Sequence, residues 1–151
     1  MTQSLSLSGT QTKKSKIKLI KQEHVNGCLI AVIAMMAGKT YDQIFQKLYN
    51  KPASSVDNWD MRGINFKHYE KVIAKFGIEL NETKAQVFRD LHKPTFAVIH
   101  WRGSSMAHGI IYDPYNKLIL DPGRYDQLEN WEYEYQVHKL YHFNKGNNER
   151  L

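Results

Sequence analysis

The sequence predicts an α+β fold in which N-terminal helices pack on a C-terminal antiparallel sheet. In the first half, apolar residues recur at helical spacing or form one short continuous run, whereas the second half alternates and is rich in β-branched and aromatic residues. Helices come first and strands follow, without the alternation that a parallel sheet requires. A length of 151 residues, 42% of them hydrophobic, suits one domain with its own core.

We expect this single domain to span residues 16–145. Residues 1–15 are rich in Ser, Thr, Gln and Lys, so they predict a disordered basic tail, and residues 146–151 predict a flexible C-terminus. The net charge of +6 does not predict nucleic-acid binding, because no basic stripe continues beyond the N-terminal region. Five of the basic residues lie in or beside the tail: Lys13, Lys14, Lys16, Lys18 and Lys21.

The first predicted helix covers Cys28–Ala37, which is apolar on every side, and Gly38 is expected to end it. Thr40 and Gln43 have the spacing of a capping box, which predicts that a second helix begins in "YDQIFQKLYN". The segment "NKPASSVDNWDMRG" then reads as a connecting loop, because it is rich in Pro, Ser, Asp and Gly.

A third helix is predicted in "NFKHYEKVIAKFG", with Gly77 at its end. Thr83 and Gln86 repeat the capping spacing, and predict a short helix that ends before Pro94. Four strands are then expected in "TFAVIHW", "AHGIIYD", "KLIL" and "WEYEYQVHKLYHF". The last of these should place its apolar and aromatic residues on one face: Trp131, Tyr133, Tyr135, Val137, Tyr141 and Phe143.

Several classes of protein are disfavoured by what the sequence lacks. The longest apolar stretch, Cys28–Ala37, is too short to span a bilayer and too far from the N-terminus for a signal peptide. We therefore expect no membrane span and a cytoplasmic location, with export by another route left open. The chain has no paired CxxC, no Walker loop and no GxGxxG, so we expect no metal and no cofactor.

Cys28, the only cysteine, is a candidate nucleophile. Thiol catalysis needs a thiolate, a base and a donor for the oxyanion. Cys28 follows Gly27 at the predicted start of a helix, where the dipole and the free N–H groups favour a thiolate. The amide of Gln22 could turn back and donate near the Cys28 backbone. Taken alone, however, a free cysteine beside Leu29 and Ile30 is more typical of a core residue.

A predicted hairpin supplies the partners that such a thiol would need. If residues 114–115 form its tip, Tyr112 faces Lys117 and His108 faces Asp121. Paired positions on one face of a hairpin lie about 4.5–5.5 Å apart at Cβ. The register thus places an imidazole beside a carboxylate, and a catalytic base needs such an acceptor to hold its tautomer.

Together these residues resemble the papain-like cysteine peptidases, most closely the bacteriocin-processing peptidases that cut after double-glycine leaders. Gln22 and Cys28 match their glutamine, five residues and cysteine, while His108 opens a strand and Asp121 stands in a "DP" pair. The resemblance covers roughly residues 17–122. It implies a papain-like fold in which the cysteine attacks, the histidine is the base, the aspartate orients it and the glutamine helps to hold the oxyanion.

The context of the cysteine departs from the family pattern. Family members usually have Asp-Cys-Gly, whereas this chain has "NGCLI", so the bulky Leu29 would narrow the site or alter its donors. The chain also shows no transporter segments, and we therefore expect a stand-alone enzyme with a peptide or protein substrate.

Four residues keep alternative interpretations. His100 could rival His108 as the base, although a strand-surface role is more typical. His24 could line the substrate entrance or stand in a solvated loop. Trp101 could flank a cleft or simply pack, and Asp113 is the alternative carboxylate, although its place at the far end of the strand suits a turn.

The sequence thus favours hydrolysis of a peptide bond by a Cys-His-Asp triad with a Gln-assisted oxyanion hole. Two alternatives stay open, namely acyl transfer or deamidation by the same triad, and a non-catalytic peptide-binding module. Nothing in the sequence identifies the substrate's own sequence.

Overall fold

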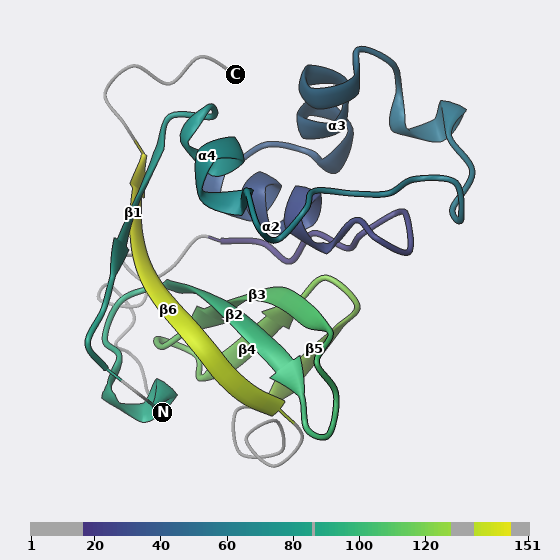
Figure 1. Cartoon of the computed structure of the whole chain (residues 1–151). Coiled ribbons are helices and arrows are strands. Elements are labelled where there is room, and N and C mark those ends of the chain that lie inside the picture. Colours follow the sequence, from purple (N-terminus) through teal and green to yellow (C-terminus); the bar gives the residue numbers. More distant parts are fainter. Residues whose placement is uncertain (1–16, 86, 128–134, 146–151) are drawn as a thin grey trace, which may run out of the picture.

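The computed structural model describes residues 17–85, 87–127 and 135–145, and it shows an α+β arrangement of helices beside one antiparallel sheet (Figure 1). The expected tail over residues 1–15 and the C-terminus over residues 146–151 lie outside these ranges. The predicted fold class, helices first and sheet afterwards, is confirmed at this level.

The first two helices form where the sequence predicts them. α2 spans Cys28–Ala37 with all ten residues buried, and Gly38 ends it in the left-handed conformation at φ 71°. α3 spans Tyr41–Tyr49, and its capping box is complete: the Gln43 backbone N–H donates to Thr40 Oγ1 (3.0 Å), and the Thr40 N–H donates to Gln43 Oε1 (2.9 Å). The end of one helix and the start of the next are therefore fixed locally.

The later helices are shorter than predicted. α4 spans only Tyr69–Ala74, and the loop before it contains the 3-10 turn η1, Ala53–Ser55. The prediction of a helix before Pro94 is wrong. The strand β1 (Ile78–Glu82) ends just before Thr83, and between Thr83 and Pro94 the described residues form only a 3-10 turn, η2 (Phe88–Asp90). Thr83 Oγ1 accepts from the Ala85 N–H, which makes a turn rather than a helix cap, and Gln86 lies outside the described residues.

Within the described residues the sheet has six strands in the order β1-β6-β2-β3-β4-β5. Every neighbouring pair is antiparallel. Besides β1, the strands are β2 (Thr95–Trp101), β3 (Ala107–Asp113), β4 (Leu118–Asp121), β5 (Arg124–Gln127) and β6 (Tyr135–Lys145). β6 crosses the sheet as one long curved strand between β1 and β2 (Figure 1).

The β3–β4 hairpin has a different register from the predicted one. Tyr112 pairs with Ile119, not with Lys117, so the loop contains residues 114–117. Asp113 holds this loop, because its carboxylate accepts from the Tyr115 backbone N–H at 3.0 Å and from the Asn116 side chain at 2.8 Å. This confirms the turn role of Asp113. A shift of two residues keeps every side chain on its expected face, since the side-chain period of a strand is two.

The single-face prediction for the last strand is also wrong. Between Val98 and Ile99 the pairing of β2 with β6 skips from Lys139 to Val137, which leaves His138 as an extra residue in β6. Tyr135 and Val137 consequently pack in one apolar cluster, whereas Tyr141 packs in the other. Trp131 and Tyr133 lie outside the described residues.

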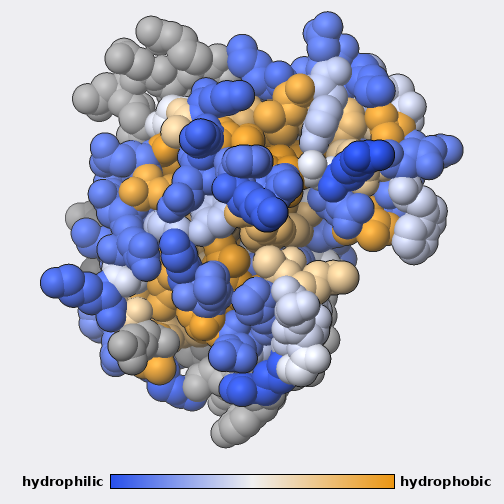
Figure 2. Space-filling view, viewed as in Figure 1, coloured by the Kyte–Doolittle hydropathy of each residue, from blue (hydrophilic) through white to orange (hydrophobic). Residues whose placement is uncertain are grey.

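The larger apolar cluster lies between the helices and the sheet. α2 packs against β3, and Leu29 lies so close to it that a Cβ on Gly109 would stand 3.1 Å from Leu29 Cδ2. On the outer surface, hydrophilic side chains alternate with apolar ones over both the helical part and the sheet (Figure 2). No single helix among the described residues is long and apolar enough to cross a membrane; α2 and α3 reach that length only together, across a 114° bend.

Candidate active site

Cys28 stands at the first position of α2, and 9% of its surface is exposed. Gly27 is the N-cap residue, and within residues 17–85, 87–127 and 135–145 no side chain caps this end of the helix. The first N–H groups of a helix have no partner within the helix, and together with the dipole they favour a negative charge. The location of Cys28 therefore suits a thiolate.

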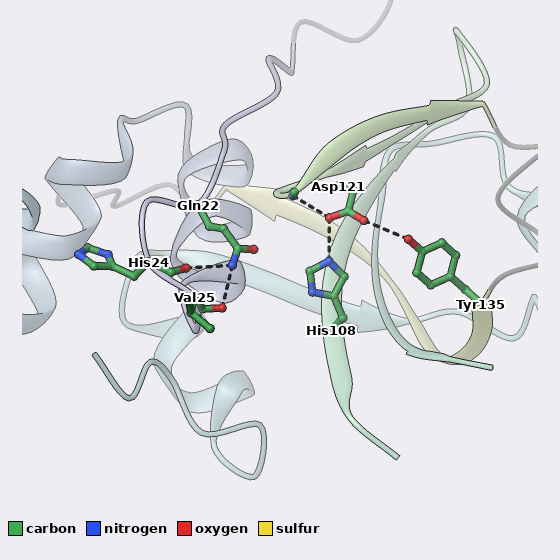
Figure 3. Close-up of polar contacts among 7 residues, drawn as sticks. Gln22, His24, Val25, His108, Asp121 and Tyr135 are labelled. Carbon is green, nitrogen blue, oxygen red and sulfur yellow. Dashed lines mark hydrogen bonds and ion pairs between the residues drawn. The ribbon is translucent and has the colours of Figure 1, made fainter. Parts of the chain in front are cut away.

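His108 and Asp121 meet across the β3–β4 hairpin. The His108 Nε2 atom lies 2.7 Å from Asp121 Oδ1, with 15% of the histidine side chain and 4% of the aspartate side chain exposed (Figure 3). They are diagonal neighbours rather than directly opposite, because the observed register would bring Asp121 level with Ile110. The predicted contact thus forms in spite of the different register.

The protonation of His108 depends on both of its partners. Burial lowers its pKa, but hydrogen bonds to Asp121 and to Cys28, together with their charges, raise the pKa to about 10. Because Nε2 is taken by Asp121, Nδ1 is the ring nitrogen that remains for the thiol. The arrangement is a partly buried imidazole between a carboxylate and a sulfur atom, and its raised pKa favours the protonated form, as in an activated thiol nucleophile.

Asp121 is held by groups other than the histidine. Its Oδ1 atom also accepts from the Gly123 backbone N–H at 2.8 Å, and its Oδ2 atom accepts from the Tyr135 hydroxyl at 3.5 Å. Trp101 packs against Tyr135 in a tilted arrangement with ring centroids 4.1 Å apart, and it stacks on His108 with centroids 6.4 Å apart. These contacts hold the carboxylate in place and cover one side of the imidazole.

Gln22 lies beside this group but does not hold its amide ready for an oxyanion. Its backbone N–H donates to the Pro122 carbonyl at 3.0 Å. Its side-chain Nε2 donates to the carbonyls of His24 and Val25, both at 2.9 Å, while the buried Oε1 atom has no hydrogen-bond partner among the described residues (Figure 3). Both N–H groups of the amide are therefore engaged in this conformation.

A cleft of about 540 Å³ opens over the pair. Trp101, which is 39% exposed, stands in its wall, which agrees with a residue that flanks a cleft. The lining residues are Lys21, Gln22, Glu23, His24, Val25, Asn58, Trp101, His108, Asp121, Pro122 and Gly123.

His24 is not the solvated loop histidine that was the alternative interpretation, because only 3% of it is exposed. Its Nδ1 atom lies 2.8 Å from the Tyr41 hydroxyl, and Nε2 lies 3.1 Å from the carbonyl oxygens of both Ala53 and Val56. The ring points away from His108 (Figure 3). His24 therefore contributes its backbone to the cleft wall and its ring to the core.

Leu29 and His100 also lie outside the cleft wall. Leu29 is 1% exposed and packs against β3. It is Ile99, not His100, that pairs with His108, and the His100 ring packs against His138 at 5.3 Å, beside a different cavity of about 280 Å³. The bulky residue after the cysteine thus points into the core. The His100 ring lies beside His138 and not beside His108, where a rival base would have to lie.

Tyr135 and Gly123 are parts of this site that sequence reasoning did not single out. The sequence marks Tyr135 only as one aromatic residue of an alternating strand, and the distance between residues 121 and 135 gives no local signal. Gly123 could have been noticed, because an Asp two residues before a Gly in a turn often accepts from its N–H. Among the described residues, no cluster of three or more His, Cys, Asp or Glu side chains could hold a metal ion.

The structure thus defines an α+β protein in which an imidazole and a carboxylate line one cleft, and the thiol of Cys28 is a further hydrogen-bond partner of that imidazole. No protein-family model matches the chain, and no curated protein has a matching sequence.

Proposed function

We propose that this protein is a cysteine peptidase of the papain-like class, which hydrolyses a peptide bond in a peptide or protein substrate. The observation that carries the proposal is the position of His108, with Asp121 at 2.7 Å on one ring nitrogen and Cys28 as its other partner. A core cysteine would have no need of a partly buried imidazole that is itself oriented by a carboxylate.

In this mechanism the Cys28 sulfur attacks the carbonyl carbon of the scissile bond, and the C=O electrons move to the oxygen. The oxyanion lies at the uncapped N-terminus of α2, where the Cys28 backbone N–H can donate to it. His108 then gives a proton to the leaving nitrogen as the C–N bond breaks. A thioester and a free amine result.

Water completes the cycle. His108, now neutral, takes a proton from a water molecule, whose oxygen attacks the thioester carbon. Collapse of the second tetrahedral intermediate breaks the C–S bond, releases the acid product and restores the thiolate and the imidazolium. Asp121 keeps the imidazole in one orientation throughout, because it also accepts from Gly123 and Tyr135.

The papain-like assignment is supported by the order of these parts. The cysteine begins a buried helix, the histidine lies near the start of a strand of an antiparallel sheet, and the carboxylate ends the next strand. The helix packs directly against the histidine's strand, which brings residues 80 positions apart into one site (108 minus 28).

The test is covalent labelling by a peptidyl electrophile that mimics an acyl donor. The wild-type protein should be labelled at Cys28 and nowhere else, and His108→Ala should lower the labelling rate by roughly 10²-fold. His100→Ala is the matched control, since it removes a histidine from a neighbouring strand without touching the pair. Equal rates for wild type and His108→Ala would overturn the mechanism.

A library of peptides then tests turnover. The wild-type protein should release acid and amine products, whereas Cys28→Ala should release neither. The product masses with and without an added amine distinguish hydrolysis from acyl transfer.

A further inference from the structure

Gln22 connects the two halves of the candidate site. On one side its backbone N–H donates to the carbonyl of Pro122, the residue after Asp121. On the other side its side-chain amide donates to the carbonyls of His24 and Val25, in the loop that leads to Cys28. One residue thus ties the turn that carries the carboxylate to the loop that carries the nucleophile.

The loop that Gln22 holds is firmly attached to the helical part. The His24 carbonyl also accepts from the Gly27 N–H at 3.0 Å, directly before the cysteine. The His24 ring contacts Tyr41, Ala53 and Val56 from its buried position. A displacement of this loop would therefore move the first turn of α2, and with it the thiol.

The orientation of the amide argues against a direct role at the oxyanion. An amide group has two N–H donors, and both are used by the loop carbonyls at 2.9 Å. The atom on the side facing His108 is Oε1 (Figure 3), for which the described part of the chain supplies no hydrogen-bond partner. A carbonyl oxygen would repel an oxyanion, and reversing the amide would instead point Oε1 at two carbonyl oxygens.

We propose that Gln22 is a positioning residue, which clamps the loop before Cys28 to the turn after Asp121 and so sets the spacing between the thiol and the imidazole. The catalytic meaning of this clamp rests on the proposed peptidase function, whereas the clamp itself is a property of the fold. The oxyanion is then left to the backbone N–H groups at the start of α2.

The first test compares wild type with Gln22→Met, which keeps a similar length but removes both donors without adding a charge. If Gln22 is a clamp, the Cys28–His108 contact loosens, so the His108 pKa measured by NMR falls by about one unit or more. The rate of Cys28 alkylation by iodoacetamide should change as well. Gln136→Met on the exposed face of β6 is the control and should change neither quantity.

An oxyanion donor would behave differently. Its loss would slow peptide hydrolysis by roughly 10²–10³-fold but would leave the His108 pKa and the alkylation rate unchanged, because alkylation forms no oxyanion. That pattern would overturn the clamp and leave the peptidase proposal intact. A lower His108 pKa in Gln22→Met without any peptide turnover by wild type would support the clamp and contradict the peptidase.

A second measurement uses the wild-type protein, and so does not depend on the folding of a variant. A peptide aldehyde forms a hemithioacetal with a reactive thiol, and its oxygen occupies the oxyanion position. With a clamp, the two side-chain N–H resonances of Gln22 and their slow exchange with solvent persist when the aldehyde is added. A large downfield shift of either resonance would show donation to the oxyanion and overturn the proposal.

Discussion

The His108 Nε2 atom lies 2.7 Å from Asp121 Oδ1, although the two residues are diagonal rather than opposite across the β3–β4 hairpin. A diagonal contact of this kind depends on where the carboxylate is held. Here the Gly123 N–H and the Tyr135 hydroxyl donate to the carboxylate and hold it in place. The orientation of His108 therefore depends on contacts from outside the two strands of this hairpin.

Asp121→Asn should destabilise the protonated form of His108 while leaving the neighbouring residues in place. Asparagine keeps the shape but loses the charge that helps to raise the His108 pKa to about 10. The pKa of His108 should fall by more than about one unit, and peptide turnover by roughly 10²-fold or more. NMR titration measures the first effect. Asp113→Asn, in the turn of the same hairpin, should leave the His108 pKa unchanged; a similar fall there would contradict this assignment.

The raised His108 pKa also predicts how two inactivators respond to pH. Opening of a peptidyl epoxide by a thiolate needs a proton on the departing oxygen, whereas alkylation by iodoacetamide needs none. The ratio of the epoxide rate to the iodoacetamide rate should therefore fall as the pH rises through about 10, where His108 loses its proton. Parallel curves for the two reagents above pH 9 would show that His108 does not supply the proton.

The same pKa shift links the folded state to pH. The His108 pKa is about 6.5 in an unfolded chain and about 10 in the fold, so the fold binds the proton more tightly. The stabilisation is fully present below pH 6.5 and is lost as the pH rises to about 10. Urea unfolding should show the stability advantage of wild type over His108→Gln shrinking across this window, by an amount on the order of a few kcal/mol. A constant difference would contradict the linkage.

Gly27→Ala should destabilise the protein by steric conflict. A Cβ at Gly27 would clash with the Tyr41 hydroxyl oxygen. We expect a loss of about 1–3 kcal/mol in the free energy of unfolding. Tyr41→Phe removes the clashing oxygen, so the double variant should recover part of this loss, even though Tyr41→Phe alone loses the contact with His24. Strict additivity in a double-mutant cycle would exclude this clash as the cause.

The sequence predicts those parts of the fold that local chemistry determines. α2 begins at Cys28 and ends at Gly38, and the capping box of Thr40 and Gln43 forms as expected, because these signals act within a few residues. β3 has its predicted bounds for a similar reason: a β-rich run is bounded by turn residues.

The remaining errors come from interactions between distant segments. β1 forms because residues 78–82 pair with residues 141–145 of β6, and nothing near "IELNE" announces that partner. The bulge at His138 and the Tyr135–Asp121 contact are likewise decided across the sheet. In the candidate site, spacing sufficed to find Cys28, His108 and Asp121, but the donors of Gln22 are directed by backbone carbonyls whose positions the sequence does not specify.

The placement of β6 between β1 and β2 has a consequence for biosynthesis. Residues 135–145 are the last strand that the structure describes, and they leave the ribosome after every other described element. Until they emerge, β1 and β2 each keep an unpaired edge, and the Tyr135 support of Asp121 is missing. The support that orients the imidazole is therefore completed only when this last described strand joins the sheet.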